Sequence, residues 1–152
     1  HPPLGKLVFA AVGWCVGLGD DGFMFESVAS KYLPTTPYTM LRATSSVFGA
    51  VLVPLVYDMM LLMGCSRTSA ALATTFVLCE NALITQSRFI MLDSQLLTWI
   101  FGVVWSYLWF RNLPAHKHFG VEWWMGLLLQ GLFLGAALST KLVGLFCTAL
   151  LG

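Results

Sequence analysis

The sequence predicts an all-α membrane protein built from several antiparallel helices, and three observations support this. Apolar residues make up 58% of the 152 residues and charged residues only 10%, whereas a soluble domain usually carries about 25% charged residues. Long uncharged stretches alternate with short polar breaks, which is typical of a multi-spanning chain. Several of the few charges lie at the ends of these stretches, where they are costly unless they reach the interface or serve a site.

Residues 1–37 are predicted to form an interfacial segment. The uncharged stretch from Leu7 to Gly19 has 13 residues, whereas crossing the hydrocarbon takes about 20 helical residues. We therefore expect a short juxtamembrane helix here, interfacial or re-entrant. The stretch from Asp20 to Pro37 is polar and broken by prolines, so a loop is expected, with a short helix around Phe23–Tyr32.

Residues 38–152 are predicted to form a transmembrane bundle of about four full spans and the start of a fifth, on the length that a span requires. Pro54 is expected to kink the first span, and Asp93 is expected to cap the N-terminus of the third. The predicted spans are Tyr38–Met63, Ser69–Ile84, Asp93–Phe110, Glu122–Ser139 and a segment from Leu142 onward, and the run Thr85–Arg88 forms a polar break.

Short connections force neighbouring spans to run antiparallel, which assigns the polar residues to two sides. Arg67 and the Arg111–His118 loop share one side. The other side holds His1–Pro37, Arg42, Gln86–Arg88, Asp93 and Lys141. The positive-inside rule does not decide the topology, because three cations lie on the first side and five on the second.

Five residues on the second side, in three places along the chain, are candidates for binding an anion or a sugar. Arg42 lies about one turn inside its span, where its guanidinium could grip a phosphate through two hydrogen bonds or anchor to lipid headgroups. Gln86, Arg88 and Asp93 fit a sugar or phosphate site, and a simple Arg88–Asp93 ion pair is the alternative. Lys141 lies between two apolar runs, so it points into a cavity or snorkels to the interface.

Other charged segments give weaker indications. Two prolines precede Lys6 and stiffen the segment from His1, so Lys6 should project near the membrane surface, for a site or as a snorkelling anchor. His116 and His118 lack a third ligand, and a solvated loop fits them better than a metal site. The formal net charge of +1 does not indicate nucleic-acid binding.

Four separated strings together resemble the dolichyl-phosphate-mannose–protein mannosyltransferase family, the protein O-mannosyltransferases. They cover essentially the whole chain in the order and spacing of the family. The strings are HPPLGK at residues 1–6, PY and LRA within residues 37–43, TQSRFIMLDS at residues 85–94, and GAALSTKLVGLF at residues 135–146.

The resemblance implies a multi-spanning helix bundle of the GT-C glycosyltransferase type in the endoplasmic reticulum membrane. Such enzymes transfer mannose, with inversion, from dolichyl phosphate mannose to Ser or Thr hydroxyls of secretory proteins, and they typically work as dimers. The donor is lipid-linked, and no tightly bound cofactor or metal is expected. The resemblance also implies that the side carrying Arg42, Arg88 and Lys141 is luminal and holds the lipid phosphate.

On this resemblance each candidate residue receives a role. Arg42 and Lys141 are expected to contact the phosphate, and Gln86 and Arg88 to support the phosphate or the sugar. Asp93 is expected to orient Arg88 or bind a mannose hydroxyl. The remaining two residues, His1 and Lys6, would line the luminal entrance.

The resemblance also implies parts that these 152 residues lack. The family's acidic Asp-Glu pair, which supplies the general base, would lie upstream of His1, and its luminal MIR domains would follow later spans. We therefore expect a fragment of a longer enzyme that is inactive alone. Two alternatives remain open, a non-catalytic transporter or lipid-binding scaffold, and a polyprenyl-phosphate transferase for another sugar.

Overall fold

The computed structural model describes residues 2–18 and 36–151, and every regular element in this part of the chain is helical. His1 and the expected helix around Phe23–Tyr32 lie outside the described residues. The elements are α1 (Leu4–Cys15), α2 (Tyr38–Leu62), α3 (Arg67–Cys79), α4 (Asn81–Arg88), α5 (Asp93–Arg111), η1 (Ala115–Lys117), α6 (Val121–Thr140), η2 (Leu142–Leu145) and α7 (Phe146–Leu151).

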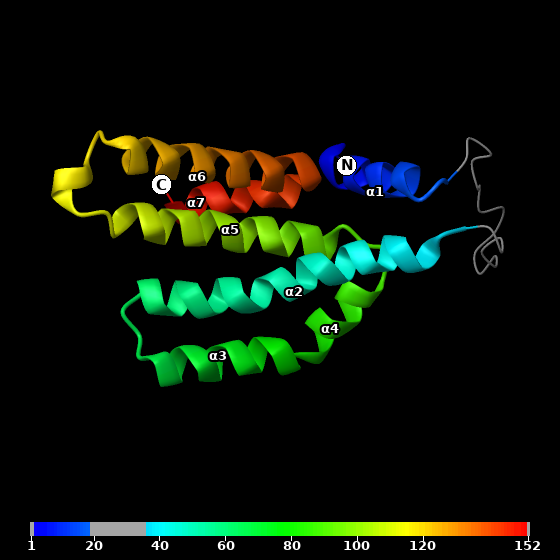
Figure 1. The fold of residues 1–152 in the computed structure, drawn as a ribbon, viewed down its shortest axis with the longest axis horizontal. Helices are drawn as coiled ribbons and strands as arrows, with labels where there is room; N and C mark the ends of the chain where they lie inside the picture. Colours follow the sequence, from blue (N-terminus) through cyan, green and yellow to red (C-terminus); the bar gives the residue numbers. More distant parts are fainter. Residues whose placement is uncertain (1, 19–35, 152) are drawn as a thin grey trace.

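Helices α2, α5 and α6 lie side by side and alternate in direction, with α5 in the middle (Figure 1). An aromatic cluster joins them, because the Trp99 ring of α5 lies 5.4 Å from Phe48 of α2 and 6.2 Å from Phe133 of α6. The Thr98 hydroxyl, 2.9 Å from the Phe48 carbonyl oxygen, can donate across the same interface. Helix α5 is therefore the core of the bundle, which explains why it buries the polar residues Ser94, Gln95, Thr98 and Ser106.

The second predicted span is not one straight helix. The apolar run predicts a span over Ser69–Ile84 with a polar break after it, but the helix breaks at Glu80 and α4 continues through Thr85–Arg88. The axes of α3 and α4 differ by 53°. The prediction was wrong because Glu80 adopts an extended ψ of 117° and its carboxylate accepts a hydrogen bond from the Leu83 N–H at 2.6 Å. It thereby caps a new helix.

Two helices, α2 and α6, are long and apolar enough to cross a membrane, and the bent pair α3–α4 makes a third candidate. Helix α5 has 19 residues, but it is not among these candidates. Protein covers much of its surface, so its polar residues need not face lipid. The chain is a membrane protein, and the count of four full spans stays a prediction.

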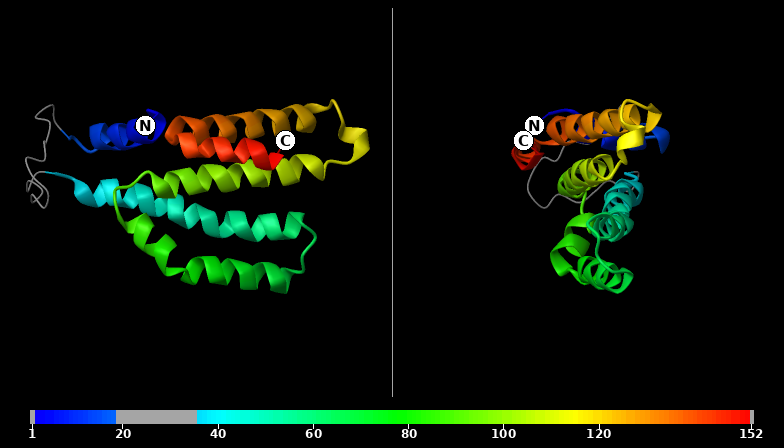
Figure 2. Two further views of the ribbon diagram at one scale, coloured as in Figure 1. Left: turned by 180° about the vertical axis from the view of Figure 1, so that it is seen from behind. Right: turned by 90° about the vertical axis from the view of Figure 1, so that its left-hand side faces the viewer.

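The polar breaks gather at two opposite ends of the bundle, as the antiparallel arrangement requires. One end collects the start of α2, the end of α4, the start of α5 and the end of α6 (Figures 1 and 2). We call it the cationic end, because Arg42, Arg88 and Lys141 belong to those termini. The opposite end carries Arg67 and the connection through η1.

Helix α1 packs against the bundle at the cationic end. A Cβ built on Gly5 would lie 2.7 Å from Leu92 Cδ2, and 3.1 Å from both Gln95 Oε1 and Thr140 Cγ2. A larger residue here would have to displace the end of the Leu92 side chain, so glycine favours this close approach of α1 to the start of α5 and the end of α6. Its place in the membrane interface stays a prediction.

Candidate functional site

Two arginines from different helices line one cavity at the cationic end. Arg42 and Ser46 of α2 face Arg88 and Phe89, at the end of α4, across a volume of about 430 Å³. The Arg42 guanidinium also lies 5.6 Å from the centre of the Tyr38 ring. Neither arginine forms an ion pair within residues 2–18 and 36–151. Two like charges that share a cavity repel each other, so an anion placed between them would be stabilised.

A serine contact holds the two arginine-bearing helices together. The Ser46 hydroxyl lies 3.0 Å from the Ser87 carbonyl oxygen of α4 and 3.1 Å from the Arg42 carbonyl oxygen of its own helix. One turn further along α2, a Cβ on Gly49 would lie 2.6 Å from Ser87 Cβ. The close contact of Gly49 with Ser87 therefore sets the separation of Arg42 and Arg88.

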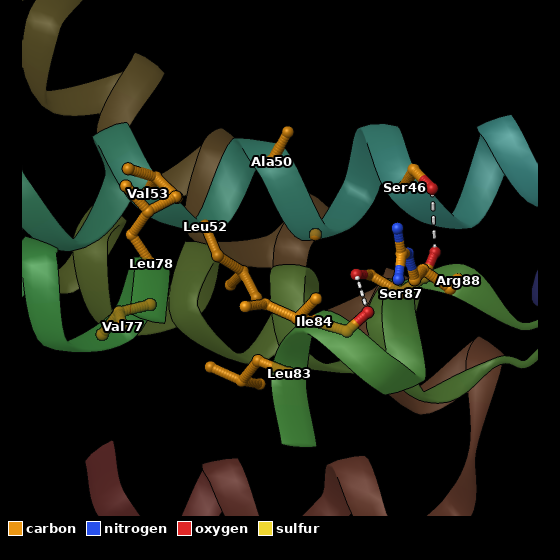
Figure 3. A pocket seen from close by; sticks show the side chains of 11 residues that line it. Ser46, Ala50, Leu52, Val53, Val77, Leu78, Leu83, Ile84, Ser87 and Arg88 are labelled. Carbon is orange, nitrogen blue, oxygen red and sulfur yellow. Dashed lines mark hydrogen bonds between the residues drawn. The ribbon is translucent and has the colours of Figure 1, made fainter. Parts of the chain in front are cut away.

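The Arg42–Arg88 cavity adjoins a second, apolar cavity of about 270 Å³ between α2, α3 and α4 (Figure 3). Ser46 and Arg88 line both spaces. We call the apolar space the α2–α4 groove. Six aliphatic side chains form its walls: Leu52 and Val53 from α2, Val77 and Leu78 from α3, and Leu83 and Ile84 from α4.

Lys141 and Asp93 form an ion pair between the end of α6 and the start of α5. The Lys141 ammonium lies 2.9 Å from Asp93 Oδ1, and the two side chains are 31% and 28% exposed. Two expectations for Asp93 were therefore wrong. It does not pair with Arg88, and it does not cap α5, whose N-cap is Leu92 without a side-chain bond. The Asp93 carboxylate stabilises the half-buried Lys141 ammonium more than it would stabilise the guanidinium of Arg88, which is solvated.

Two further candidates, Gln86 and Lys6, do not line the Arg42–Arg88 cavity. Gln86 is half-buried on α4. Lys6 is exposed on α1, and His1 lies outside the described residues. Within the described part of the chain, no three His, Cys, Asp or Glu side chains are grouped to hold a metal.

Sequence reasoning missed Ser46 and Gln95. Ser46 is unremarkable in sequence, since its role depends on the carbonyl of a residue 41 positions away. Gln95 is fully buried, and neither polar atom of its amide has a partner among the described residues. An amide inside a helical, largely apolar run is the one signal that could have pointed to it, because such groups are costly to bury.

In chemical terms, the cationic end has the features of a lipid-phosphate site. Guanidinium groups bind phosphate oxygens through charge-assisted hydrogen bonds, and an apolar groove opens beside them. The single carboxylate placed here by the described residues, Asp93, is engaged by Lys141. The arrangement can thus bind an anion, and Asp93 is not a free general base because Lys141 engages it.

The chain matches the family model described as dolichyl-phosphate-mannose-protein mannosyltransferase over residues 1–152. It is 37% identical to "Protein O-mannosyl-transferase 1" of Mus musculus over 145 residues, which is 95% of this chain and 19% of the mouse protein. It is 35% identical to "Dolichyl-phosphate-mannose--protein mannosyltransferase 4" of Candida albicans over 153 residues, covering 100% of this chain and 20% of that protein.

Among solved structures, the fold resembles a chain of the S. cerevisiae protein O-mannosyltransferase Pmt1-Pmt2 complex bound to the sugar donor. The TM-score is 0.90 at 34% sequence identity, and the match covers 98% of this chain and 20% of that chain. This confirms the predicted fold class, part of a multi-spanning helix bundle of the GT-C type.

These matches agree in sequence and in fold, and the chain spans about a fifth of the length of the relatives that it matches. The chain belongs to the dolichyl-phosphate-mannose-protein mannosyltransferase family.

Proposed function

We propose that the full-length protein containing this chain transfers mannose from dolichyl phosphate mannose to Ser or Thr hydroxyls of secretory proteins, in the endoplasmic reticulum membrane. The family match and the names of the relatives support the reaction. The observation that carries the role of this chain is that Arg42 and Arg88, which form no ion pair among the described residues, line one cavity at the cationic end.

The cationic end would bind the donor phosphate and stabilise it as a leaving group. Negative charge develops on the phosphate as the glycosidic bond breaks, and fixed cations lower the energy of that transition state. Arg42 and Arg88 provide two such charges in the same cavity. Gln86, on the same helix as Arg88, would support the phosphate or the sugar.

The Lys141–Asp93 pair would lie on the sugar side of the phosphate. The ammonium keeps two further donor hydrogens beyond the one directed at Asp93, and one of them would donate to a phosphate oxygen. The second oxygen of the Asp93 carboxylate can accept from a mannose hydroxyl. Asp93 would therefore hold Lys141 and orient the sugar, while the proton acceptor for the Ser or Thr hydroxyl would come from the segment preceding His1.

We further propose that the cationic end faces the lumen, with Lys6 and His1 near the entrance, and that the protein works as a dimer with another family member. A dimer is supported by the matched yeast structure, which is a Pmt1-Pmt2 complex. In this arrangement the cations of the five-cation side are kept for an anionic ligand rather than for cytoplasmic anchoring.

The test is transfer of labelled sugar by the full-length protein with its partner subunit. Labelled mannose should pass from dolichyl phosphate mannose to a Ser/Thr peptide, and dolichyl phosphate glucose should give no transfer. Glucose transfer without mannose transfer would assign the protein to another sugar. Donor binding with no transfer of either sugar would point to a lipid-binding scaffold.

A further inference from the structure

Gln95 is buried where the start of α1 meets the end of α6. These two helix ends lie next to each other, and the first turn of α5, which carries Gln95, passes beside them (Figures 1 and 2). A Cβ built on Gly5 of α1 would lie 3.1 Å from Gln95 Oε1 and 3.1 Å from Cγ2 of Thr140, the last residue of α6. Three helices therefore enclose one amide.

The Gln95 amide is costly in this place. Its side chain is fully buried, and neither Oε1 nor Nε2 has a hydrogen-bond partner within residues 2–18 and 36–151. A buried amide without partners loses its hydrogen bonds to bulk water, whereas a methionine would occupy a similar volume without that loss. Gln95 therefore has a hydrogen-bonding capacity that packing alone does not require.

Both neighbouring helix ends offer backbone groups that an amide can bind. The first helical hydrogen bond of α1 joins the Leu7 N–H to the Pro3 carbonyl oxygen at 2.9 Å, so the N–H groups of residues 4–6 lie outside the helical ladder. No side chain in the described part of the chain caps this helix. The last carbonyl groups of α6 also lack partners within their own helix. A glutamine offers one acceptor oxygen to such N–H groups and two donor hydrogens to such carbonyl groups.

Gln95 Oε1 is close enough to the start of α1 for one water molecule to connect them. A Cβ lies about 2.5 Å from the backbone nitrogen of its own residue. Because Oε1 lies 3.1 Å from the Cβ position of Gly5, it is within roughly 5.6 Å of the Gly5 nitrogen, and two hydrogen bonds of about 2.8–3.0 Å span that distance. Buried waters typically make about three hydrogen bonds to otherwise unpaired polar groups, and this junction supplies such groups from three helices.

The junction adjoins the ion pair of the cationic end. Asp93 precedes Gln95 by two residues, and Lys141 directly follows Thr140. The side chains of Asp93 and Lys141 meet at 2.9 Å. A movement of the start of α1 would therefore disturb the helix ends that hold this pair. It would also move the point at which the chain preceding α1 enters the cationic end.

We propose that Gln95 is a positioning residue whose amide, through buried water, joins the N–H groups at the start of α1 to the carbonyl groups at the end of α6. It thereby holds the chain that enters α1 beside the Lys141–Asp93 pair. The inference rests on the proposed function, in which the proton acceptor comes from the segment preceding His1. Because Gln95 does not line the Arg42–Arg88 cavity, it acts on turnover and not on phosphate binding.

The test compares Gln95→Met with Ser106→Ala in the full-length protein with its partner subunit. Ser106 is a buried polar residue of the same helix, but its hydroxyl donates to the Val103 carbonyl oxygen. In Gln95→Met, the backbone amides of residues 4–6 should exchange hydrogen roughly tenfold faster. The kcat for mannose transfer should fall about tenfold, while the Kd for dolichyl phosphate stays unchanged. Ser106→Ala should change none of the three quantities.

Three results would overturn the proposal. Unchanged hydrogen exchange at residues 4–6 in a folded Gln95→Met protein would show that the amide does not hold α1. Faster exchange with an unchanged kcat would show that this contact does not position the reaction. A weaker Kd for dolichyl phosphate that accounts for the whole loss of transfer would place Gln95 in the binding of the donor.

A second variant approaches the junction from α1 and decides the question if Gln95→Met does not fold. Gly5→Ala places a methyl group 3.1 Å from Gln95 Oε1, whereas Gly13→Ala, at the other end of α1, meets only Leu18. Gly5→Ala should lower kcat with the Kd for dolichyl phosphate unchanged, and Gly13→Ala should change neither. The effect of Gly5→Ala and Gln95→Met together should be smaller than the product of the single effects, because both disrupt one contact. Equal kcat values for Gly5→Ala and Gly13→Ala contradict the proposal.

The failure of the proposed function looks different from the failure of this inference. Hydrogen exchange at the start of α1 does not depend on the reaction. Faster exchange in Gln95→Met, in a protein that transfers no mannose, supports the contact in the junction and overturns the proposed function. Mannose transfer with the same kcat in Gln95→Met and the unmodified protein supports the proposed function and overturns this inference.

Discussion

The two ends of the bundle carry cations in different settings. At the opposite end, Lys117 pairs with Glu122 at 3.0 Å, and Arg67 and Arg111 lie at separate helix ends, where the cavity that Arg111 lines has no second cation in its wall. At the cationic end, Arg42 and Arg88, which are exposed like Arg67 and Arg111, come from two helices and line one shared cavity without an ion-pair partner among the described residues.

Polar groups at the opposite end are also satisfied within the fold. The indole N–H of Trp105 donates to Asp58 Oδ2 at 2.6 Å, and the Asn112 amide donates to the Leu62 carbonyl oxygen at 2.7 Å. Both bonds join α2 to α5 or to the residue that follows it. Trp105, Asn112 and Lys117 therefore serve the fold at this end, whereas Arg42 and Arg88 share one cavity without a carboxylate partner in the part of the chain that the structure describes. Four predictions test this contrast.

The largest effect is expected for Arg42→Ala in the full-length enzyme. Charge-assisted hydrogen bonds to a phosphate are worth about 1.5–3 kcal/mol, so kcat/KM for dolichyl phosphate mannose should fall by roughly tenfold or more. Arg42→Lys should recover only part of the loss, because an ammonium cannot make the two parallel hydrogen bonds of a guanidinium. Arg111→Ala, the matched change at the opposite end, should leave transfer unchanged. Equal mannose transfer by the Arg42→Ala and Arg111→Ala variants would contradict the difference between the two ends.

A smaller loss, of stability, is expected for Gly49→Ala. The new methyl group would lie 2.6 Å from Ser87 Cβ, and relieving such overpacking costs about 1–3 kcal/mol. The apparent Tm should fall by a few degrees, because α4 has to move away from α2. Gly131→Ala is the control, since nothing lies within 4 Å of its added Cβ. Equal Tm values for the two variants would show that α2 and α4 are not in close contact.

The Lys141–Asp93 pair should show coupling in a double-mutant cycle measured by thermal unfolding. Lys141→Met alone leaves a half-buried carboxylate without its cation and should cost about 1–2 kcal/mol, less than for a fully buried pair. Adding Asp93→Asn should recover part of that loss. Strictly additive single effects would mean that the 2.9 Å contact contributes nothing to stability.

The smallest effect is expected for Lys117→Ala at the opposite end. The side chains of Lys117 and Glu122 are 40% and 44% exposed, and exposed pairs are worth about 0–1 kcal/mol. The apparent Tm should hardly change, and mannose transfer should stay at the level of the unmodified enzyme. A loss of mannose transfer in this variant would mean that a charge at the opposite end is needed for the reaction, which contradicts the difference between the two ends.

The sequence was sufficient for features that depend on local composition. The apolar runs predicted α2, α5 and α6 to within one residue at each end, because each run is bounded by polar residues or turn formers. Antiparallel order followed from the short connections. It correctly placed Arg42, Arg88 and Lys141 at one end.

Features that depend on residues far apart in the chain could not be predicted from the sequence. The carboxylate of Asp93 pairs with Lys141, 48 residues away, although Arg88 is much nearer along the chain. The break at Glu80 was missed, because a single acidic residue in an apolar run looks the same whether or not it caps a new helix. The groove and the burial of Gln95 depend on how α4 and α1 pack, which periodicity does not report.

Binding of dolichyl phosphate to the full-length protein measures the contribution of the cationic end without the chemical step. Arg42→Ala and Arg88→Ala should each raise the Kd by about tenfold, which corresponds to about 1.4 kcal/mol, and Arg111→Ala should leave it unchanged. Equal Kd values for all three variants and the unmodified protein would contradict the assignment of the lipid phosphate to the cationic end.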